Sequence, residues 1–155
     1  MAKMYPSIIS KDCKSPGERE VFKKLKYDPD TKDWIVIHSL NIADHITQTS
    51  GEADFVIIVP NIGILVLEVK GHKVISRDDH GIWYFGREKK QEERGPFTQA
   101  SDCKFSIIDY LSSISNVFKK IHIASGVCFP IAPFNGSSIE WHDWELVDSV
   151  KFKKK

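Results

Sequence analysis

The chain has 155 residues, 41% of them hydrophobic, which is the size of one domain able to bury about two-thirds of its unfolded surface. Its 22 Lys and Arg residues against 21 Asp and Glu residues give a formal net charge of +1. This balance excludes a strong overall field toward nucleic acids, membranes or acidic substrates. Any contact with nucleic acid must therefore come from a local patch.

Three cysteines, Cys13, Cys103 and Cys128, occur singly, without the paired spacing of a zinc site or a disulfide framework. We interpret them as reduced thiols and expect a cytoplasmic protein. The N-terminal residues lack the apolar run of a signal peptide, and no segment approaches the ~20 apolar residues of a membrane span. We therefore expect no membrane partner.

The first predicted helix runs from Pro16 to Lys26. Ser15 is placed as its N-cap, proline fills the first helical position, and Glu18 completes a capping box. A strand rich in β-branched and aromatic residues is predicted over residues 34–40. The polar residues 41–50 have no pattern, and we expect a loop there.

Residues 52–70 (EADFVIIVPNIGILVLEVK) give the clearest hairpin, because Pro60, Asn61 and Gly63 separate two aliphatic runs. A three-residue loop over 60–62 pairs Val59 with Gly63. Stepping outward, it places Asp54 opposite Glu68 and Glu52 opposite Lys70. Both faces of the hairpin are apolar, which predicts that helices cover the sheet on both sides.

The remaining segments are predicted by the same rules. A short hairpin joins residues 73–77 to 82–85, and the charge run 87–94 is expected to be a solvated loop. Apolar residues near helical spacing predict the longest helix over 96–118, with Phe97, Ala100, Phe105, Ile108, Leu111, Ile114 and Phe118 as its stripe. A buried strand is expected over 125–130, and residues 141–152 can add another.

Three charged residues of the long hairpin carry candidate chemistry. Glu68 and Lys70 are two apart on a strand and share a face, and the register brings Asp54 about 4.5–5.5 Å from Glu68 between Cβ atoms. Two carboxylates this close repel unless one is protonated or a cation lies between them, and oxygen ligands favour Mg²⁺ or Mn²⁺. Such an ion with an adjacent lysine suits phosphodiester hydrolysis. The alternative is a set of surface ion pairs, such as Glu52 with Lys70.

Four blocks in order extend this pattern along the chain. They are Gly17-Glu18 at the first helix, residues 51–54 (GEAD) at the second strand, residues 67–71 (LEVKG) at the third, and residues 96–100 (PFTQA) at the long helix. With these blocks the chain resembles the nuclease-related domain family, a branch of the PD-(D/E)xK nuclease superfamily. The resemblance covers most of the chain.

The resemblance implies an α/β fold with a restriction-endonuclease-like α-β-β-β-α-β core, a mixed sheet and helices on both faces. It implies that Asp54 and Glu68 bind Mg²⁺ or Mn²⁺, that Lys70 positions the attacking water, and that Glu18 and Gln99 reach the same site. The implied substrate is DNA, with a 5′-phosphate product. Ala53 stands where the superfamily name has proline, a departure that is ordinary in this branch.

Several residues keep a second interpretation. Glu18 either joins the metal site or only caps its helix, and Gln99 is nominated by its block alone. For Glu52 we favour an ion pair with Lys70 over a metal ligand, and for His72 a solvated position. A set of basic residues is able to contact phosphates, and the alternative is that they are ordinary solvated surface residues. They are Lys73, Arg77, Arg87, Lys89, Lys90 and Lys104.

The last part of the chain is treated as an extension of a single domain spanning 1–155, whose core covers about residues 15–130. Cys128-Phe129-Pro130 and the tryptophans Trp141 and Trp144 resemble the segment after the nuclease core in members of this family that continue into a superfamily 1 helicase. A fused or associated helicase is then a partner, and the terminal lysines 153–155 are either a linker or a solvated tail. The rival functional class is a non-catalytic nucleic-acid-binding or adaptor module of a larger DNA-processing protein.

Overall fold

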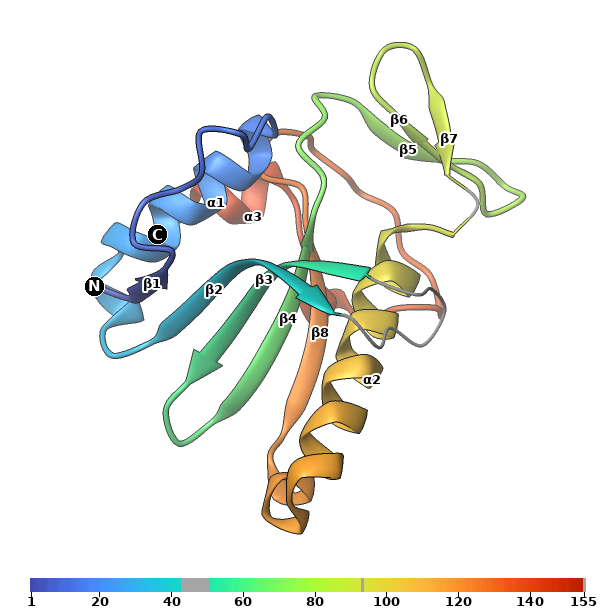
Figure 1. Ribbon diagram of the computed structural model, residues 1–155. Coiled ribbons are helices and arrows are strands. Elements are labelled where there is room, and N and C mark those ends of the chain that lie inside the picture. Colours follow the sequence, from blue (N-terminus) through green and yellow to red (C-terminus); the bar gives the residue numbers. More distant parts are fainter. Residues whose placement is uncertain (43–50, 93, 155) are drawn as a thin grey trace.

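The computed structural model describes residues 1–42, 51–92 and 94–154. A six-stranded mixed sheet in the order β1-β2-β3-β4-β8-β9 forms its centre, and a second sheet, β5-β6-β7, has three strands. In chain order, α1, β2, β3, β4, α2 and β8 give the predicted α-β-β-β-α-β core. Figure 1 shows the two main helices on opposite sides of the large sheet.

The first helix, α1 (Pro16–Tyr27), begins where the capping signal predicted, because the Ser15 hydroxyl accepts the Glu18 N–H at 3.3 Å. The next strand, β2 (Ile35–Ile42), extends past the predicted end at Leu40 into the expected loop, whose residues 43–50 lie outside the described part of the chain. A short N-terminal strand that the sequence did not predict, β1 (Lys3–Tyr5), pairs parallel with β2.

The long hairpin has the predicted register where its strands pair, but the predicted outer pairs Asp54–Glu68 and Glu52–Lys70 do not form. Strands β3 (Gly51–Val59) and β4 (Gly63–Val69) pair from Val59↔Gly63 to Phe55↔Leu67. Asn61 has a φ of 63°, a turn conformation that asparagine tolerates well. The prediction of the loop over 60–62 is therefore confirmed.

Both faces of the hairpin are covered, as expected. On one face Phe55 and Ile57 pack with Val21 and Phe22 of α1, and on the other Val56 and Val66 pack with residues of α2 (Pro96–Ile114). Strand β8 (Ile123–Cys128) lies parallel to β4 and places Val127 next to Glu68. The polar end of the hairpin is thus enclosed between two helices and a central strand.

The buried stripe of α2 differs from the predicted one. Of the predicted stripe, Ala100 is buried, but Phe105 and Ile114 are 47% and 56% exposed, whereas Cys103 and Ile107, which were not part of it, are buried. The helix also ends at Ile114, before a 3-10 turn, η2 (Asn116–Lys120). Both apolar sets follow helical spacing, and the sequence does not say which one faces the sheet.

The small sheet corrects the interpretation of the charge run. Strands β5 (Ile75–Arg77) and β6 (Trp83–Phe85) form the expected hairpin, but Lys90–Glu92 form a third strand, β7, antiparallel to β6. The expected solvated loop is wrong for these residues. Gly86 and Lys89, with φ of 78° and 51°, make the turn between the two strands.

An aromatic cluster joins the small sheet to the end of the chain. Trp141 stacks on Phe97 of α2 with 4.4 Å between ring centroids, while Trp83 contacts Phe129 and Phe134. After a 3-10 turn, η3 (Asp143–Glu145), the final elements are β9 (Leu146–Val147), parallel to β8, and α3 (Ser149–Lys153). Among the described residues, no helix is both long and apolar enough to cross a membrane.

Candidate functional site

The candidate site lies where β3 separates from β4. The paired residues end at Phe55↔Leu67, and Asp54 is the next residue of β3. Its carboxylate accepts the backbone N–H of Val69 at 2.8 Å. On the other side of β3, Ser39 of β2 has a φ of 57°, so the backbone is also irregular beside Asp54. Asp54 therefore faces the end of β4 through its side chain.

Glu68 and Lys70 lie together at that end of β4. Glu68 is 8% exposed, although it carries a carboxylate. The ammonium of Lys70 lies 3.3 Å from Glu68 Oε1 and 3.3 Å from Glu92 Oε2. The burial of the Glu68 carboxylate carries a large desolvation penalty, and Lys70, the cation beside it, also contacts the carboxylate of Glu92. Such arrangements are typical of functional sites.

The carboxyl groups of Asp54 and Glu68 both have a raised pKa. Burial raises the pKa of Asp54, the Val69 amide opposes this, and the Glu18 carboxylate raises it further. Burial also raises the pKa of Glu68, with the Asp54 carboxylate as the next cause and Lys70 opposing both. At neutral pH the pair therefore favours binding a proton when no cation is present. A bound cation would stabilise the two ionised carboxylates in its place.

The pair lies on the α2 side of the sheet. Burial, together with the carboxylates of Glu68 and Asp54, raises the pKa of the Cys103 thiol of α2 to about 11. The Cys103 thiol also donates to the Glu52 carbonyl at 3.6 Å. Helix α2 thus closes one side of the acidic pair.

The expected ion pair between Glu52 and Lys70 is wrong. Glu52 lies beyond the last β3–β4 pair, is opposite Asn41 of β2 and is exposed. Lys70 turns instead to Glu68 and Glu92 because β4 continues alongside β8, where its N–H donates to the Cys128 carbonyl at 3.0 Å. His72 is exposed, as expected.

Glu92 is a site residue that the sequence analysis missed. It lies in the charge run, and only the unexpected strand β7 brings it to Lys70. Gln99 of α2 donates through Nε2 to Glu92 Oε2 at 3.0 Å, so the predicted glutamine reaches Lys70 indirectly. The only sequence signal for Glu92 was its place shortly before the α2 block.

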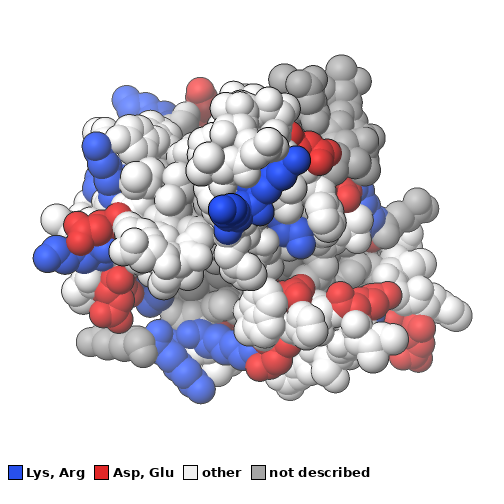
Figure 2. All heavy atoms as spheres, turned by 90° about the horizontal axis from the view of Figure 1, so that it is seen from below, with Lys and Arg blue, Asp and Glu red and all other residues white. Residues whose placement is uncertain are grey.

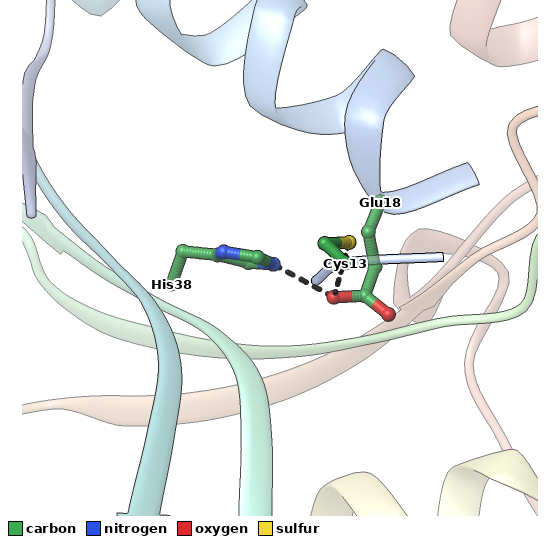
Figure 3. Close-up of side chains that lie close together, drawn as sticks. All are labelled: Cys13, Glu18 and His38. Carbon is green, nitrogen blue, oxygen red and sulfur yellow. Dashed lines mark hydrogen bonds and ion pairs between the residues drawn. The ribbon is translucent and has the colours of Figure 1, made fainter. Parts of the chain in front are cut away.

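Glu18 projects from α1 toward β2. Figure 3 shows its carboxylate between His38 and Cys13, 2.7 Å from His38 Nε2 and 3.8 Å from Cys13 Sγ. The backbone of Glu18 takes part in helix capping, while its side chain is engaged with these two residues. It remains close enough to Asp54 to raise its pKa.

Two glycines explain how α1 reaches this point. A Cβ on Gly17 would lie 2.4 Å from the Gly71 Cα, and a Cβ on Gly71 would lie 2.6 Å from the Gly17 N. Backbones can approach this closely only where both residues lack a side chain. The contact sets Glu18 beside the strand that carries Glu68 and Lys70.

The donor set suits a hard divalent cation. Asp54 and Glu68 supply carboxylate oxygens, and Mg²⁺ commonly uses one or two carboxylates while keeping water and phosphate oxygens as its other ligands. Burial raises the pKa of both groups, and the neighbouring carboxylates of Glu18 at Asp54 and of Asp54 at Glu68 raise it further, so added positive charge would stabilise the ionised pair. The residues present therefore fit Mg²⁺ or Mn²⁺.

The α-β-β-β-α-β core with this strand-end pair of acids defines a restriction-endonuclease-like domain. The model of the nuclease-related domain matches residues 14–130, and the chain belongs to that family. Comparisons with curated proteins and with solved structures gave no significant match. The family assignment establishes that the chain is a nuclease-related domain.

Proposed function

We propose that this chain is a nuclease that hydrolyses the phosphodiester bonds of DNA with Mg²⁺ or Mn²⁺ held by Asp54 and Glu68. The observation that carries the proposal is the convergence of the buried Glu68 carboxylate, the half-buried Asp54 carboxylate and Lys70 at the end of β4. Family membership supports the reaction class.

The two carboxylates have distinct supports. Asp54 is fixed by the Val69 N–H, so the lone pairs of its carboxylate that this bond leaves free can face the ligand. Glu68 is fixed by Lys70 and by burial against β8. When bound, the metal supplies a Lewis acid that polarises the phosphate and lowers the pKa of a coordinated water.

Lys70 is the residue placed to act on the substrate. Its ammonium offers three donors, and its contacts with Glu68 and Glu92 hold it at the edge of the acidic pair. From there it can orient an attacking water or stabilise charge on a phosphoryl oxygen. Glu92 and Gln99 act through Lys70 and are positioning residues.

DNA contacts are expected from the small sheet. Its segment exposes Lys73, Arg87, Lys89 and Lys90, while its third strand carries Glu92 to Lys70. Arg77 is less available than expected, since it lies over the rings of Trp83 and Trp141 and pairs with Glu140. On the face seen in Figure 2, basic and acidic side chains are interspersed, in line with the formal net charge of +1.

A cleavage assay tests this proposal. Purified protein is incubated with single-stranded, linear and supercoiled DNA and Mn²⁺ or Mg²⁺, with EDTA as the metal-free control. We expect Lys70→Ala to lower the cleavage rate by about 10²–10⁴-fold. Lys119→Ala, which removes an exposed lysine of η2 outside the residues expected to contact DNA, is the matched control and should retain cleavage.

Two outcomes would reject the nuclease assignment. Cleavage that survives Lys70→Ala would come from another site or a contaminant. DNA binding without cleavage by the wild type in either metal would favour the rival function, a non-catalytic nucleic-acid-binding module. Calorimetry with Mn²⁺ tests the ligands separately, because Asp54→Ala and Glu68→Ala should each abolish binding at the acidic pair.

A further inference from the structure

Three potential metal ligands of different chemistry meet at the start of α1. Cys13 comes from the segment before the helix, Glu18 from its first turn and His38 from β2. One ligand atom from each lies within 4.8 Å of the others. In Figure 3 all three side chains point into the same small space.

The surrounding structure holds this cluster in place. The His38 ring is packed between Phe22 and Phe55, with centroid distances of 5.7 and 4.8 Å, which leaves Nε2 directed at Glu18. Arg19 donates to the carbonyls of Ser10, Lys11 and Cys13 and thereby fixes the segment that carries the thiol. The ligands are therefore arranged by contacts that need no metal.

The distances are close to those of a tetrahedral site. With ordinary zinc bond lengths, ligand atoms are separated by about 3.4–3.6 Å. Cys13 Sγ lies 3.8 Å from Glu18 Oε2, whereas His38 Nε2 is 2.7 Å from the same oxygen. The histidine–glutamate contact must open by less than about 1 Å, which a small rotation of the part-exposed Glu18 side chain allows. The thiol and the imidazole, which lie within 4.8 Å of one another, must come to the same tetrahedral spacing.

We propose that Cys13, Glu18 and His38 bind a borderline-soft divalent ion of the Zn²⁺ class, at a site chemically distinct from the Asp54–Glu68 pair. Thiolate and imidazole ligands select Zn²⁺ or Co²⁺ over Mg²⁺, which prefers oxygen alone. Three protein ligands leave the fourth position to water. Binding releases the thiol proton to solvent, and the proton shared by His38 Nε2 and Glu18 moves to His38 Nδ1 or to solvent, so that all three ligand atoms have a free lone pair. The bound ion ties the N-terminal segment to α1 and β2.

Cobalt titration of tag-free, reduced protein tests this site. Co²⁺ bound by a thiolate gives an ultraviolet charge-transfer absorption, and tetrahedral geometry gives visible d–d bands. We expect both in the wild type and no charge-transfer band in Cys13→Ser. Loss of an outer-shell partner already costs about 10–100-fold in metal affinity, so His38→Gln, which removes a ligand, should cost at least as much.

Two control variants separate this site from the proposed nuclease site. Cys103→Ala removes the thiol beside the acidic pair, and Asp54→Asn removes one of its carboxylates. Both should keep the charge-transfer band, and Cys103→Ala should also leave the cobalt affinity unchanged. Loss of the band in Cys103→Ala would show that the cobalt binds Cys103 beside the acidic pair. That result would overturn the proposal, whatever the result of the cleavage assay.

Thermal unfolding gives a second readout that does not depend on activity. At about 100-fold excess over the dissociation constant, Zn²⁺ should raise the Tm of the wild type by roughly 5–10 °C. Cys13→Ser should show no such rise, while Cys103→Ala should show the full rise. Absence of both the cobalt band and the Tm rise in the wild type would reject the site without reference to any variant.

Discussion

The acidic pair and the Cys13–Glu18–His38 cluster lie near the same end of the large sheet but differ in their ligand atoms. Asp54 and Glu68 offer oxygen alone beside α2, whereas the cluster beside α1 offers sulfur, nitrogen and oxygen. Hard cations prefer the first set and borderline ions the second. Glu18 joins the two regions, because it binds His38 and still raises the pKa of Asp54.

The difference has a structural basis in how each region is supported. The acidic pair depends on strand pairing, since Asp54 is held by the Val69 N–H and Glu68 lies opposite Val127 of β8. The cluster depends on the approach of α1 to the sheet, which the Gly17–Gly71 contact permits. Substitutions can therefore disturb both regions together or the acidic pair alone.

The largest effect is expected from Gly17→Ala, which should disturb both regions. Helix propensity alone would favour alanine by up to about 1 kcal/mol. The new Cβ would, however, lie 2.4 Å from the Gly71 Cα, and overpacking against backbone should cost about 3 kcal/mol. Denaturant unfolding should show a net loss, with weaker cobalt binding and slower cleavage. Lys23→Ala, an exposed change on the same helix, is the control.

If Gly17→Ala is as stable as the wild type and keeps both properties, the close contact does not position α1. Gly71→Ala checks the same contact from the segment that follows β4. Its Cβ would meet the Gly17 N at 2.6 Å, so its effects should match those of Gly17→Ala.

A smaller effect, confined to the acidic region, is expected from Glu92→Gln. The amide keeps the size of the side chain but removes the charge that holds Lys70. By analogy with outer-shell partners of metal sites, we expect kcat to fall about 10–100-fold. KM and the affinity for Mn²⁺ should change little, because Glu92 acts through Lys70. Glu88→Gln, at an exposed position of the same charge run, should leave kcat unchanged.

Steady-state kinetics with Mn²⁺ measures both variants. A rise in KM with constant kcat would place Glu92 in DNA binding and not in the positioning of Lys70. Cobalt binding at Cys13 should be the same in both variants, which restricts the effect to one region.

Local pattern predicted the parts of this molecule that depend on neighbours in sequence. The register of β3 and β4 followed from Pro60, Asn61 and alternating aliphatic residues, and the start of α1 from its capping residues. Both features are governed by turn chemistry and periodicity, which short segments encode. The restriction-endonuclease-like core, which the family resemblance implied, is also confirmed.

Contacts between distant segments escaped prediction. Strand β7 forms only because β6 offers it an edge, so Glu92 looked like part of a solvated run. The meeting of Cys13 with His38 depends on the packing of α1 against β2, which leaves no mark in the spacing of the two residues. Helix α2 offered two apolar stripes, and the sheet selects the one with Cys103 and Ile107.

The smallest effect is a pH dependence that belongs to the acidic pair. Burial and the Asp54 carboxylate raise the pKa of Glu68 above its unfolded value. The stabilising contribution of the protonated form is thus complete below the unfolded pKa of about 4.3 and is lost as pH rises through the folded pKa. In EDTA, Glu68→Gln should therefore match the wild type near about pH 5 and exceed it in Tm near about pH 9, by roughly 2–4 °C for about 1 kcal/mol.

Addition of Mn²⁺ should remove this advantage, since the cation stabilises the ionised pair only in the wild type. Glu52→Gln, an exposed change on β3, should show no difference between the two pH values. A constant Tm offset of Glu68→Gln at both pH values would mean that packing, and not charge, governs the effect. The acidic pair would then lack the electrostatic conflict that distinguishes it from the cluster beside α1, and the case for a hard cation would rest on ligand chemistry alone.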